Sequence, residues 1–228
     1  MRFLERNKHY KKNEPTQDAK KIYLSCEGEK TEIKYFSFFV KFSENVEIIT
    51  IPPKESRSDP LKLMENSKLL FLGDEKKQIS PIYELNKEYG DVIWFVIDTD
   101  EWNKGNKIEK LRSFCAENNI EGETWHVAQS NPSFEQWQYY HFYGERPDNK
   151  EVGRHDSFKD FLSKKIVGGF DNRKHPLNID IAIDNSQRNF TMVDNQPALY
   201  CTELHILGNL ILNLIKDDLV IAKRIAGS

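Results

Sequence analysis

Apolar positions along the chain follow two different spacings, and the changes between them mark the expected elements. Short apolar runs rich in β-branched and aromatic residues, each ended by polar or turn-forming residues, predict strands. These runs lie at residues 22–26, 46–51, 92–97 and 125–128. Apolar positions three or four residues apart predict helices between and after the strands. The helices are expected at residues 31–43, 60–72, 107–118 and 133–143. Strand and helix thus alternate, which is typical of a mainly parallel α/β sheet flanked by helices.

The last third of the chain has a different pattern. Helical spacing dominates there, and no apolar run beyond residue 128 predicts a further strand. The expected helices cover residues 156–167, 177–190 and 200–216. We therefore expect three regions: a basic N-terminal arm over residues 1–19, an α/β domain over residues 20–145, and a C-terminal helical region over residues 146–228 that packs on the core.

Residues with cap-forming side chains predict where three helices begin. Asp59 and Asn131 each precede a proline, and such a cap followed by proline is a common start of a helix. Thr31 is expected to cap the helix that follows the first strand. The segment over residues 73–90 is expected to form a loop or short helix that packs on the sheet.

Composition narrows the class of protein. With 38% hydrophobic and 30% charged residues, the sequence predicts a soluble globular protein. No apolar run approaches the length of a membrane span, and the first residues lack the apolar core of a signal peptide. The three cysteines are far apart and lack metal-ligand spacing, so we expect buried or neutral thiols and a cytoplasmic location.

Charge is unevenly distributed along the chain. Residues 1–21 contain seven Lys or Arg and three acidic residues, whereas the rest of the chain contains 26 basic and 33 acidic residues. A basic arm in front of an acidic body suits contact with a nucleic-acid backbone, and it equally suits a solvated tail. The acidic body does not resemble the broadly basic surface of a protein that reads DNA sequence.

Acidic residues follow two of the predicted strands. Glu27 comes directly after the first strand, and Asp98 and Asp100 come after the third. The carboxyl ends of parallel strands meet at one edge of a sheet, where ligands bind. Carboxylates gathered there can hold a divalent ion for phosphodiester chemistry, can act as general acid or base, or can simply cap helices and face solvent. Glu29 and Glu32 are expected to be first-turn acids favoured by the helix dipole.

Three motifs carry a resemblance to a known family. They are Cys26-Glu-Gly-Glu-Lys-Thr-Glu32, then Phe95-Val-Ile-Asp98-Thr-Asp100, then Ser130-Asn-Pro-Ser-Phe-Glu135 followed by His141-Phe142. Over residues 20–143 the chain resembles the RloB-like family of Toprim-fold proteins. The resemblance implies a Toprim-like parallel sheet with a C-terminal helical appendage. It also implies that Glu27, Asp98 and Asp100 hold Mg²⁺ or Mn²⁺ and act in catalysis, with Glu135 of the third motif assisting.

Basic residues near these motifs are candidates for contact with nucleic acid. They are Lys30 in the first motif and Arg2, Arg6, Lys11 and Lys12 in the arm. His141 lies six residues after Glu135, and therefore on a different face of its helix. Its position predicts core packing or a hydrogen bond within the fold rather than a place in the site. The aromatic residues around it are likewise expected to be core.

The resemblance also implies a biological setting. The RloB-like family is similar to the small partner of abortive-infection and restriction-associated gene pairs, whose other member is an ABC-like or AAA-type ATPase. The implied function is a metal-dependent nuclease effector of bacterial anti-phage defence that cleaves RNA, such as tRNA, or DNA. The chain itself has no Gly-x-x-x-x-Gly-Lys-Ser/Thr loop. Two other functions stay open, a non-catalytic nucleic-acid or nucleotide-binding module and a regulatory subunit that docks on the ATPase, and so does a homo-oligomer.

Overall fold

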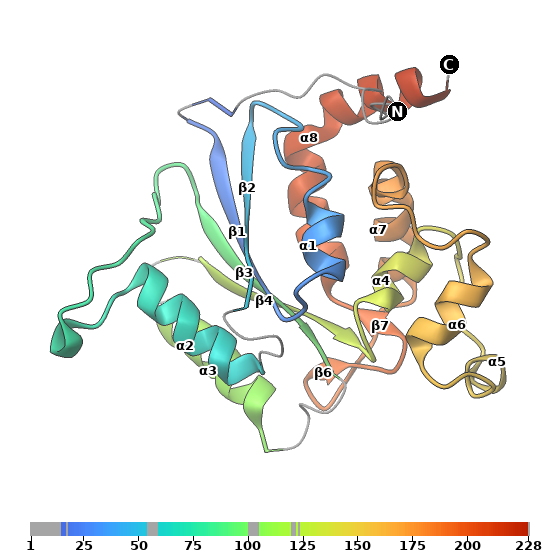
Figure 1. Ribbon diagram of the computed structural model, residues 1–228, viewed down its shortest axis with the longest axis horizontal. Helices are drawn as coiled ribbons and strands as arrows, with labels where there is room; N and C mark the ends of the chain where they lie inside the picture. Colours follow the sequence, from blue (N-terminus) through green and yellow to red (C-terminus); the bar gives the residue numbers. More distant parts are fainter. Residues whose placement is uncertain are drawn as a thin grey trace, which may run out of the picture.

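A mostly parallel sheet forms the centre of the protein (Figure 1). The computed structural model describes residues 15–16, 18–53, 59–99, 105–119, 122 and 124–227. Within these residues, five strands pair in the order β2–β1–β3–β4–β7. They are β1 (Lys20–Cys26), β2 (Val46–Ile51), β3 (Val92–Asp98), β4 (Trp125–Asn131) and β7 (Cys201–Thr202). Strands β1 to β4 run parallel, and β7 runs antiparallel to β4.

Helices cover both faces of this sheet. The helices α2 (Pro60–Phe71) and α3 (Lys107–Asn118) pack on one face, and α1 (Thr31–Phe36), α4 (Glu135–Tyr140) and α8 (Leu204–Gly227) pack on the other (Figure 1). The other elements are α5 (Asn149–Val152), α6 (Phe158–Lys165), α7 (Ile179–Arg188), the 3₁₀ helices η1 (Glu75–Lys77) and η2 (His175–Asn178), and the hairpin β5 (Met192–Val193) and β6 (Gln196–Pro197). The predicted α/β class, with a mainly parallel sheet flanked by helices and a C-terminal helix, is confirmed.

Successive strand residues point to opposite faces of the sheet and bury their side chains in two separate cores. Tyr23 and Phe95 pack with the apolar residues of α2 and α3, whereas Leu24 and Trp94 pack with those of α1, α4 and α8. Strand β3 is apolar on both faces because both faces are covered. Each fully buried large side chain contributes roughly 1.5–3 kcal/mol to folding, so the two cores hold the sheet rigidly.

Strand β7 was not expected, and the prediction that no strand follows residue 128 is wrong. Ser130 of β4 pairs with Thr202, and Asn131 pairs with Cys201. A two-residue strand is too short to produce an alternating pattern of apolar positions, so the sequence carries no signal for it. The pairing brings the C-terminal part of the chain to the end of β4, next to the carboxyl edge of the sheet.

The start of α2 is as predicted, whereas two other helix starts differ. The side chain of Asp59 accepts hydrogen bonds from Leu61 N and Lys62 N, both at 3.0 Å. Thr31 is the first residue of α1, after Lys30. Asn131 remains in β4, where its Nδ2 donates to the carbonyl of Pro197 at 2.8 Å, and α4 begins only at Glu135. Asn131 is therefore held by a strand and by the neighbouring hairpin, and it caps no helix.

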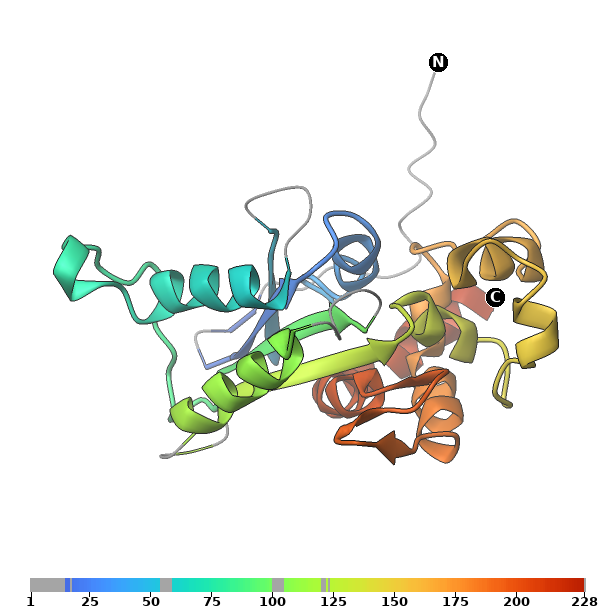
Figure 2. The same cartoon turned by 90° about the horizontal axis from the view of Figure 1, so that it is seen from below.

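Helix lengths also depart from expectation. Helix α1 ends at Phe36, and the buried aromatic residues that follow it lie in turns. Helix α8 runs well past residue 216. The segment over residues 73–90 is a loop with the short helix η1, as predicted, and Tyr83 packs against Tyr23 of the sheet. Other parts of this segment project from the body, where Ile82 is 71% exposed (Figures 1 and 2). No helix among the described residues is long and apolar enough to cross a membrane.

Candidate functional site

The first acidic pair lies where β1 and β3 end side by side. The backbone N–H of Glu27 donates to the carbonyl of Val96 at 3.0 Å and extends the pairing of β1 with β3. The Oε2 atom of Glu27 accepts a hydrogen bond from the backbone N–H of Asp98 at 3.0 Å. The parallel pairing therefore brings together two residues that are far apart in the sequence, as the strand pattern predicts.

The backbone just after Asp98 is anchored to β4. Thr99, which is buried, donates its N–H and its hydroxyl to the carbonyl of Ser130, at 2.8 and 2.9 Å. The Nε2 atom of Gln129 donates to the hydroxyl of Thr99 at 2.8 Å. These bonds fix the position of the backbone just after Asp98. Asp100 itself lies outside the described residues, as do the arm residues Arg2, Arg6, Lys11 and Lys12.

Glu32 lies in the first turn of α1, as predicted, and its carboxylate is buried beside the residues described above. Glu32 is only 4% exposed, and its Oε1 accepts a hydrogen bond from the backbone N–H of Gly28 at 3.1 Å. A methyl group on Gly28 would lie 2.2 Å from Oε2 of Glu32. The glycine is therefore required by the close approach of this carboxylate. The spacing of the motif places an acid in the first turn of α1, but only tertiary packing decides that it points inward.

Burial and a neighbouring carboxylate change the acidity of Glu32. Burial raises the pKa of the Glu32 carboxyl, and the negative charge of Glu135 raises it further. Hydrogen bonds from the backbone and the charge of Lys159 act in the opposite direction without cancelling the increase. A carboxyl group with a raised pKa exchanges protons closer to neutral pH than an exposed one. A carboxyl group with this raised pKa can act as a proton donor or acceptor. Its ionised form would be stabilised by a bound cation.

Glu135 is the second buried carboxylate, and it comes from the first turn of α4. Its side chain is nearly buried, and the hydroxyl of Ser133 donates to its Oε2 at 2.8 Å. The ammonium group of Lys159 on α6 lies 3.8 Å from its Oε1. Because Lys159 is mostly exposed, this ion pair is weak, and it leaves the ammonium group accessible.

These carboxylates line one pocket. Its volume is about 560 Å³, and Glu32, Asp98 and Glu135 line it together with Ser133, Ser157 and Lys159. The three acids come from α1, β3 and α4, so the fold gathers them from distant parts of the chain. Glu27 does not line the pocket, but its carboxylate accepts a hydrogen bond from the backbone N–H of Asp98. Of the predicted positions, Asp98 and Glu135 therefore share one pocket, and Glu32 is a pocket residue that the sequence did not single out.

The chemistry of the pocket suits a hard cation. Carboxylate and hydroxyl oxygens are the ligands that Mg²⁺ and Mn²⁺ prefer, and repulsion between Glu32 and Glu135 would be relieved by a positive ion. Among the described residues, no three His, Cys, Asp or Glu side chains lie close enough together to form a metal-binding group. The donor types are therefore those that a hard cation prefers, whereas their present spacing does not form a complete metal site.

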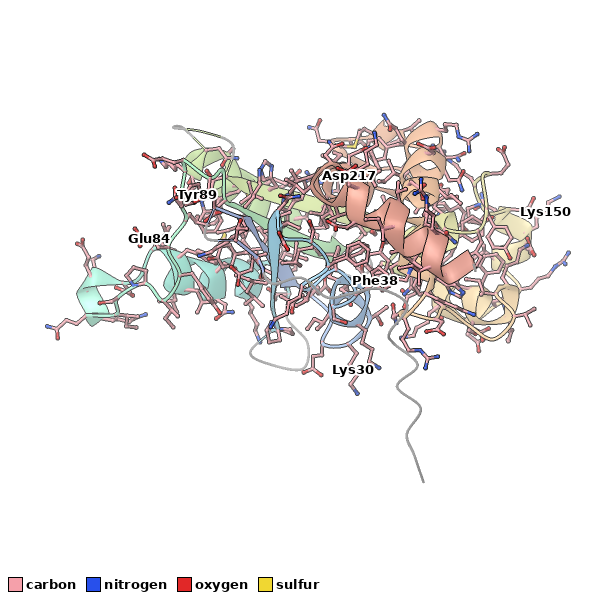
Figure 3. The ribbon with its side chains drawn as sticks, turned by 90° about the horizontal axis from the view of Figure 1, so that it is seen from above. Lys30, Phe38, Glu84, Tyr89, Lys150 and Asp217 are labelled. Carbon is pink, nitrogen blue, oxygen red and sulfur yellow. The ribbon has the colours of Figure 1, made fainter. Side chains whose placement is uncertain are left out.

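Other residues singled out in the sequence lie elsewhere. Lys30 is exposed at the start of α1, and its side chain points outward (Figure 3). His141 is buried, its Nε2 lies 3.2 Å from the hydroxyl of Tyr35, and its Nδ1 lies 3.0 Å from the carbonyl of Trp137. Burial lowers the pKa of His141 to about 3. The predicted structural role of His141 is confirmed, as is the burial of all three cysteines, which are free thiols.

The chain also matches a protein family. A family model described as RloB-like protein matches residues 22–209, which is most of the chain and includes every carboxylate of the pocket. No curated protein and no solved structure matches the chain.

Proposed function

The chain belongs to the RloB-like protein family, and from this membership together with the carboxylate pocket we propose that it is a Toprim-type, metal-dependent nuclease. The observation that carries the proposal is the convergence of Glu32, Asp98 and Glu135 on one pocket at the carboxyl edge of a parallel sheet. Nucleases of this kind use carboxylates and a divalent ion to hydrolyse phosphodiester bonds. The pocket supplies such carboxylates on rigid elements.

The residues proposed to hold the ion are Asp98, Asp100 and Glu27. Glu32 and Glu135 line the pocket together with Asp98. When bound, Mg²⁺ or Mn²⁺ would supply positive charge that offsets the charge of the phosphate and lowers the pKa of a water molecule. The presence of Glu32 supports this assignment, because a buried carboxylate beside a second one gains most from a nearby cation.

The protein's own side chains have separable tasks in this proposal. Glu27 fixes the backbone N–H of Asp98, and Ser133 orients the carboxylate of Glu135. Glu32, with its raised pKa, can accept a proton from water or return one to the leaving oxygen. Lys159 sits beside Glu135 and can stabilise negative charge on a phosphate that enters the pocket.

A cleavage assay tests the proposal. Wild-type protein, Asp98→Asn and Asp217→Asn would be incubated with tRNA and with supercoiled plasmid, in Mg²⁺, in Mn²⁺ and in EDTA. Asp217 lies on α8, away from the pocket, and serves as a matched loss of one carboxylate (Figure 3). We expect metal-dependent cleavage by wild type and by Asp217→Asn, and loss of cleavage in Asp98→Asn. Cleavage that Asp98→Asn retains, or that EDTA does not abolish, contradicts the proposal.

We further propose that the nuclease is an effector of anti-phage defence and is regulated by an ABC-type or AAA-type ATPase. Apolar side chains on the last turns of α8 favour such docking, because Val220, Ile221 and Ile225 are 44%, 54% and 42% exposed. The test is co-purification with the ATPase encoded alongside. Ile221→Glu/Ile225→Glu should release the ATPase, whereas Ile206→Glu, at the other end of α8, should not. Equal co-purification of all variants contradicts the docking site.

A further inference from the structure

A second pocket lies beside the carboxylate pocket and has the opposite charge. Its volume is about 240 Å³, and Lys30, Lys34 and Lys159 line it. The two pockets share Thr31, Glu135 and Lys159, so they are continuous at the ion pair between Lys159 and Glu135. An acidic pocket and a basic pocket therefore stand next to each other on the same side of the protein.

The lysines of the second pocket come from the start of α1 and from α6. Lys30 and Lys34 are four residues apart, and the backbone N–H of Lys34 donates to the carbonyl of Lys30 at 2.9 Å. They therefore lie on one face of α1, one turn apart. Lys159 comes from the first turn of α6, on the other side of the pocket. The three side chains are exposed, so their ammonium groups are accessible to a ligand.

The balance of charge in this pocket favours an anion. Glu135 is the one acidic residue among the described residues that line it, against three lysines. The polar side chains of Ser163 and Asn172 complete the wall. The side-chain oxygen of Asn172 is buried and has no hydrogen-bond partner among the described residues. A ligand with several negative charges would therefore form ion pairs with the lysines here, and the side chains of Ser163 and Asn172 can donate hydrogen bonds to it.

We propose that the pocket formed by Lys30, Lys34 and Lys159 binds the phosphodiester backbone of a nucleic-acid strand beside the carboxylate pocket. This inference rests on the proposed nuclease function and adds the surface that holds its substrate. The acidic body repels phosphates. The positive charge of the three lysines would offset this repulsion and allow a phosphate to come near the carboxylates. RNA and DNA share this backbone chemistry, so the pocket by itself accepts either.

Salt-dependent binding tests this role without requiring cleavage. Fluorescently labelled 20-nucleotide single strands of RNA and of DNA would be titrated with protein in EDTA, at a series of salt concentrations. The variant is Lys30→Ala/Lys34→Ala/Lys159→Ala, and Lys34→Arg/Lys159→Arg is a charge-preserving companion. The matched control is Lys68→Ala/Lys150→Ala/Lys216→Ala, whose three exposed lysines come from α2, α5 and α8. Thermal unfolding of each variant checks that it is folded.

The slope of log affinity against log salt reports how many phosphates are neutralised, at about 0.7 for each contact with a single strand. We expect the triple Lys→Ala variant to lose about 2 from this slope and to bind at least about tenfold more weakly at low salt. The control and the arginine variant should keep the wild-type slope. A different affinity for RNA and DNA in wild type would identify the preferred strand.

Two results would overturn the inference. One is an equal loss of slope in the triple variant and in the control, which would mean that the lysines act only through net charge. The other is wild-type protein that binds neither strand in EDTA. The nuclease proposal is judged separately by cleavage with Mg²⁺ and Asp98→Asn, so a failure here is distinguishable from a failure there.

Discussion

Replacing Glu32 by glutamine tests whether this buried carboxyl group has a raised pKa, because the substitution should change how the free energy of unfolding depends on pH. Glu32 is 4% exposed, and burial together with Glu135 raises its pKa above the value of the unfolded chain. The folded protein therefore binds more protons than the unfolded protein between these two pKa values. Its unfolding free energy decreases as pH rises through this window, and the cost is fully present above the folded pKa.

The size of the effect follows from linkage. Each unit of the upward shift corresponds to about 1.4 kcal/mol of unfolding free energy. Glutamine cannot ionise, and its side-chain oxygen can still accept the hydrogen bond from Gly28 N. Below the raised pKa of the folded protein, where Glu32 is neutral, Glu32→Gln should change stability little. As pH rises above it, without metal, Glu32→Gln should become increasingly more stable than wild type.

Urea unfolding followed by tryptophan fluorescence measures this difference between pH 5 and pH 8 in EDTA. Glu29→Gln is the matched control, because Glu29 is exposed in the same loop. Saturating Mn²⁺ should stabilise wild type more than Glu32→Gln at pH 8, because the charge of Glu32 favours the ion; an ion at 100 times its Kd adds about 2.7 kcal/mol to a protein that binds it. A Glu32→Gln protein whose stability relative to wild type does not increase with pH would refute this reasoning.

Three further predictions concern one glycine beside the pocket and two residues that lie away from it. Gly28→Ala should displace the Glu32 carboxylate, break the 3.1 Å bond from Gly28 N, and cost about 1–3 kcal/mol in urea unfolding; unchanged stability would show that the close approach is unimportant. Arg112→Met removes the 2.6 Å ion pair with the buried carboxylate of Glu203 and should cost about 3 kcal/mol, part of which Arg112→Met/Glu203→Gln regains in a double-mutant cycle. The ring of His141 should show no titration between pH 5 and pH 8 by NMR, because burial lowers its pKa to about 3; a midpoint in that range would contradict its burial. Its protonation on unfolding should therefore lower stability as pH falls below 6.5.

The elements that the sequence predicts well are those with a long periodic signal. Strand β3 and helix α3 agree with prediction. A strand that is buried on both faces has a continuous apolar run, and an amphipathic helix has apolar residues three or four positions apart. From these, the meeting of Glu27 with Asp98 follows without knowledge of side-chain positions, since parallel strands bring their ends together.

The features that could not be predicted from the sequence depend on tertiary packing. Strand β7 is two residues long and exists only because it pairs with β4. Glu32 has the same local sequence context as a solvated first-turn acid, and its burial depends on residues distant in the sequence, such as Glu135 of α4 and Phe158 of α6, that line the same pocket. The basic pocket likewise brings Lys34 close to Lys159, although more than a hundred residues separate them in the sequence. The spacing of residues along the chain does not predict such a contact.

Calorimetric titration with Mn²⁺ tests the central claim most directly, because it asks whether the carboxylate pocket is a metal site. Wild type, Asp98→Asn and Asp217→Asn would be compared, with and without a phosphorothioate oligonucleotide. The account predicts that wild type and Asp217→Asn bind Mn²⁺ and that Asp98→Asn binds at least about tenfold more weakly. Equal binding by all three proteins, or absence of binding by wild type even with the oligonucleotide present, would contradict it.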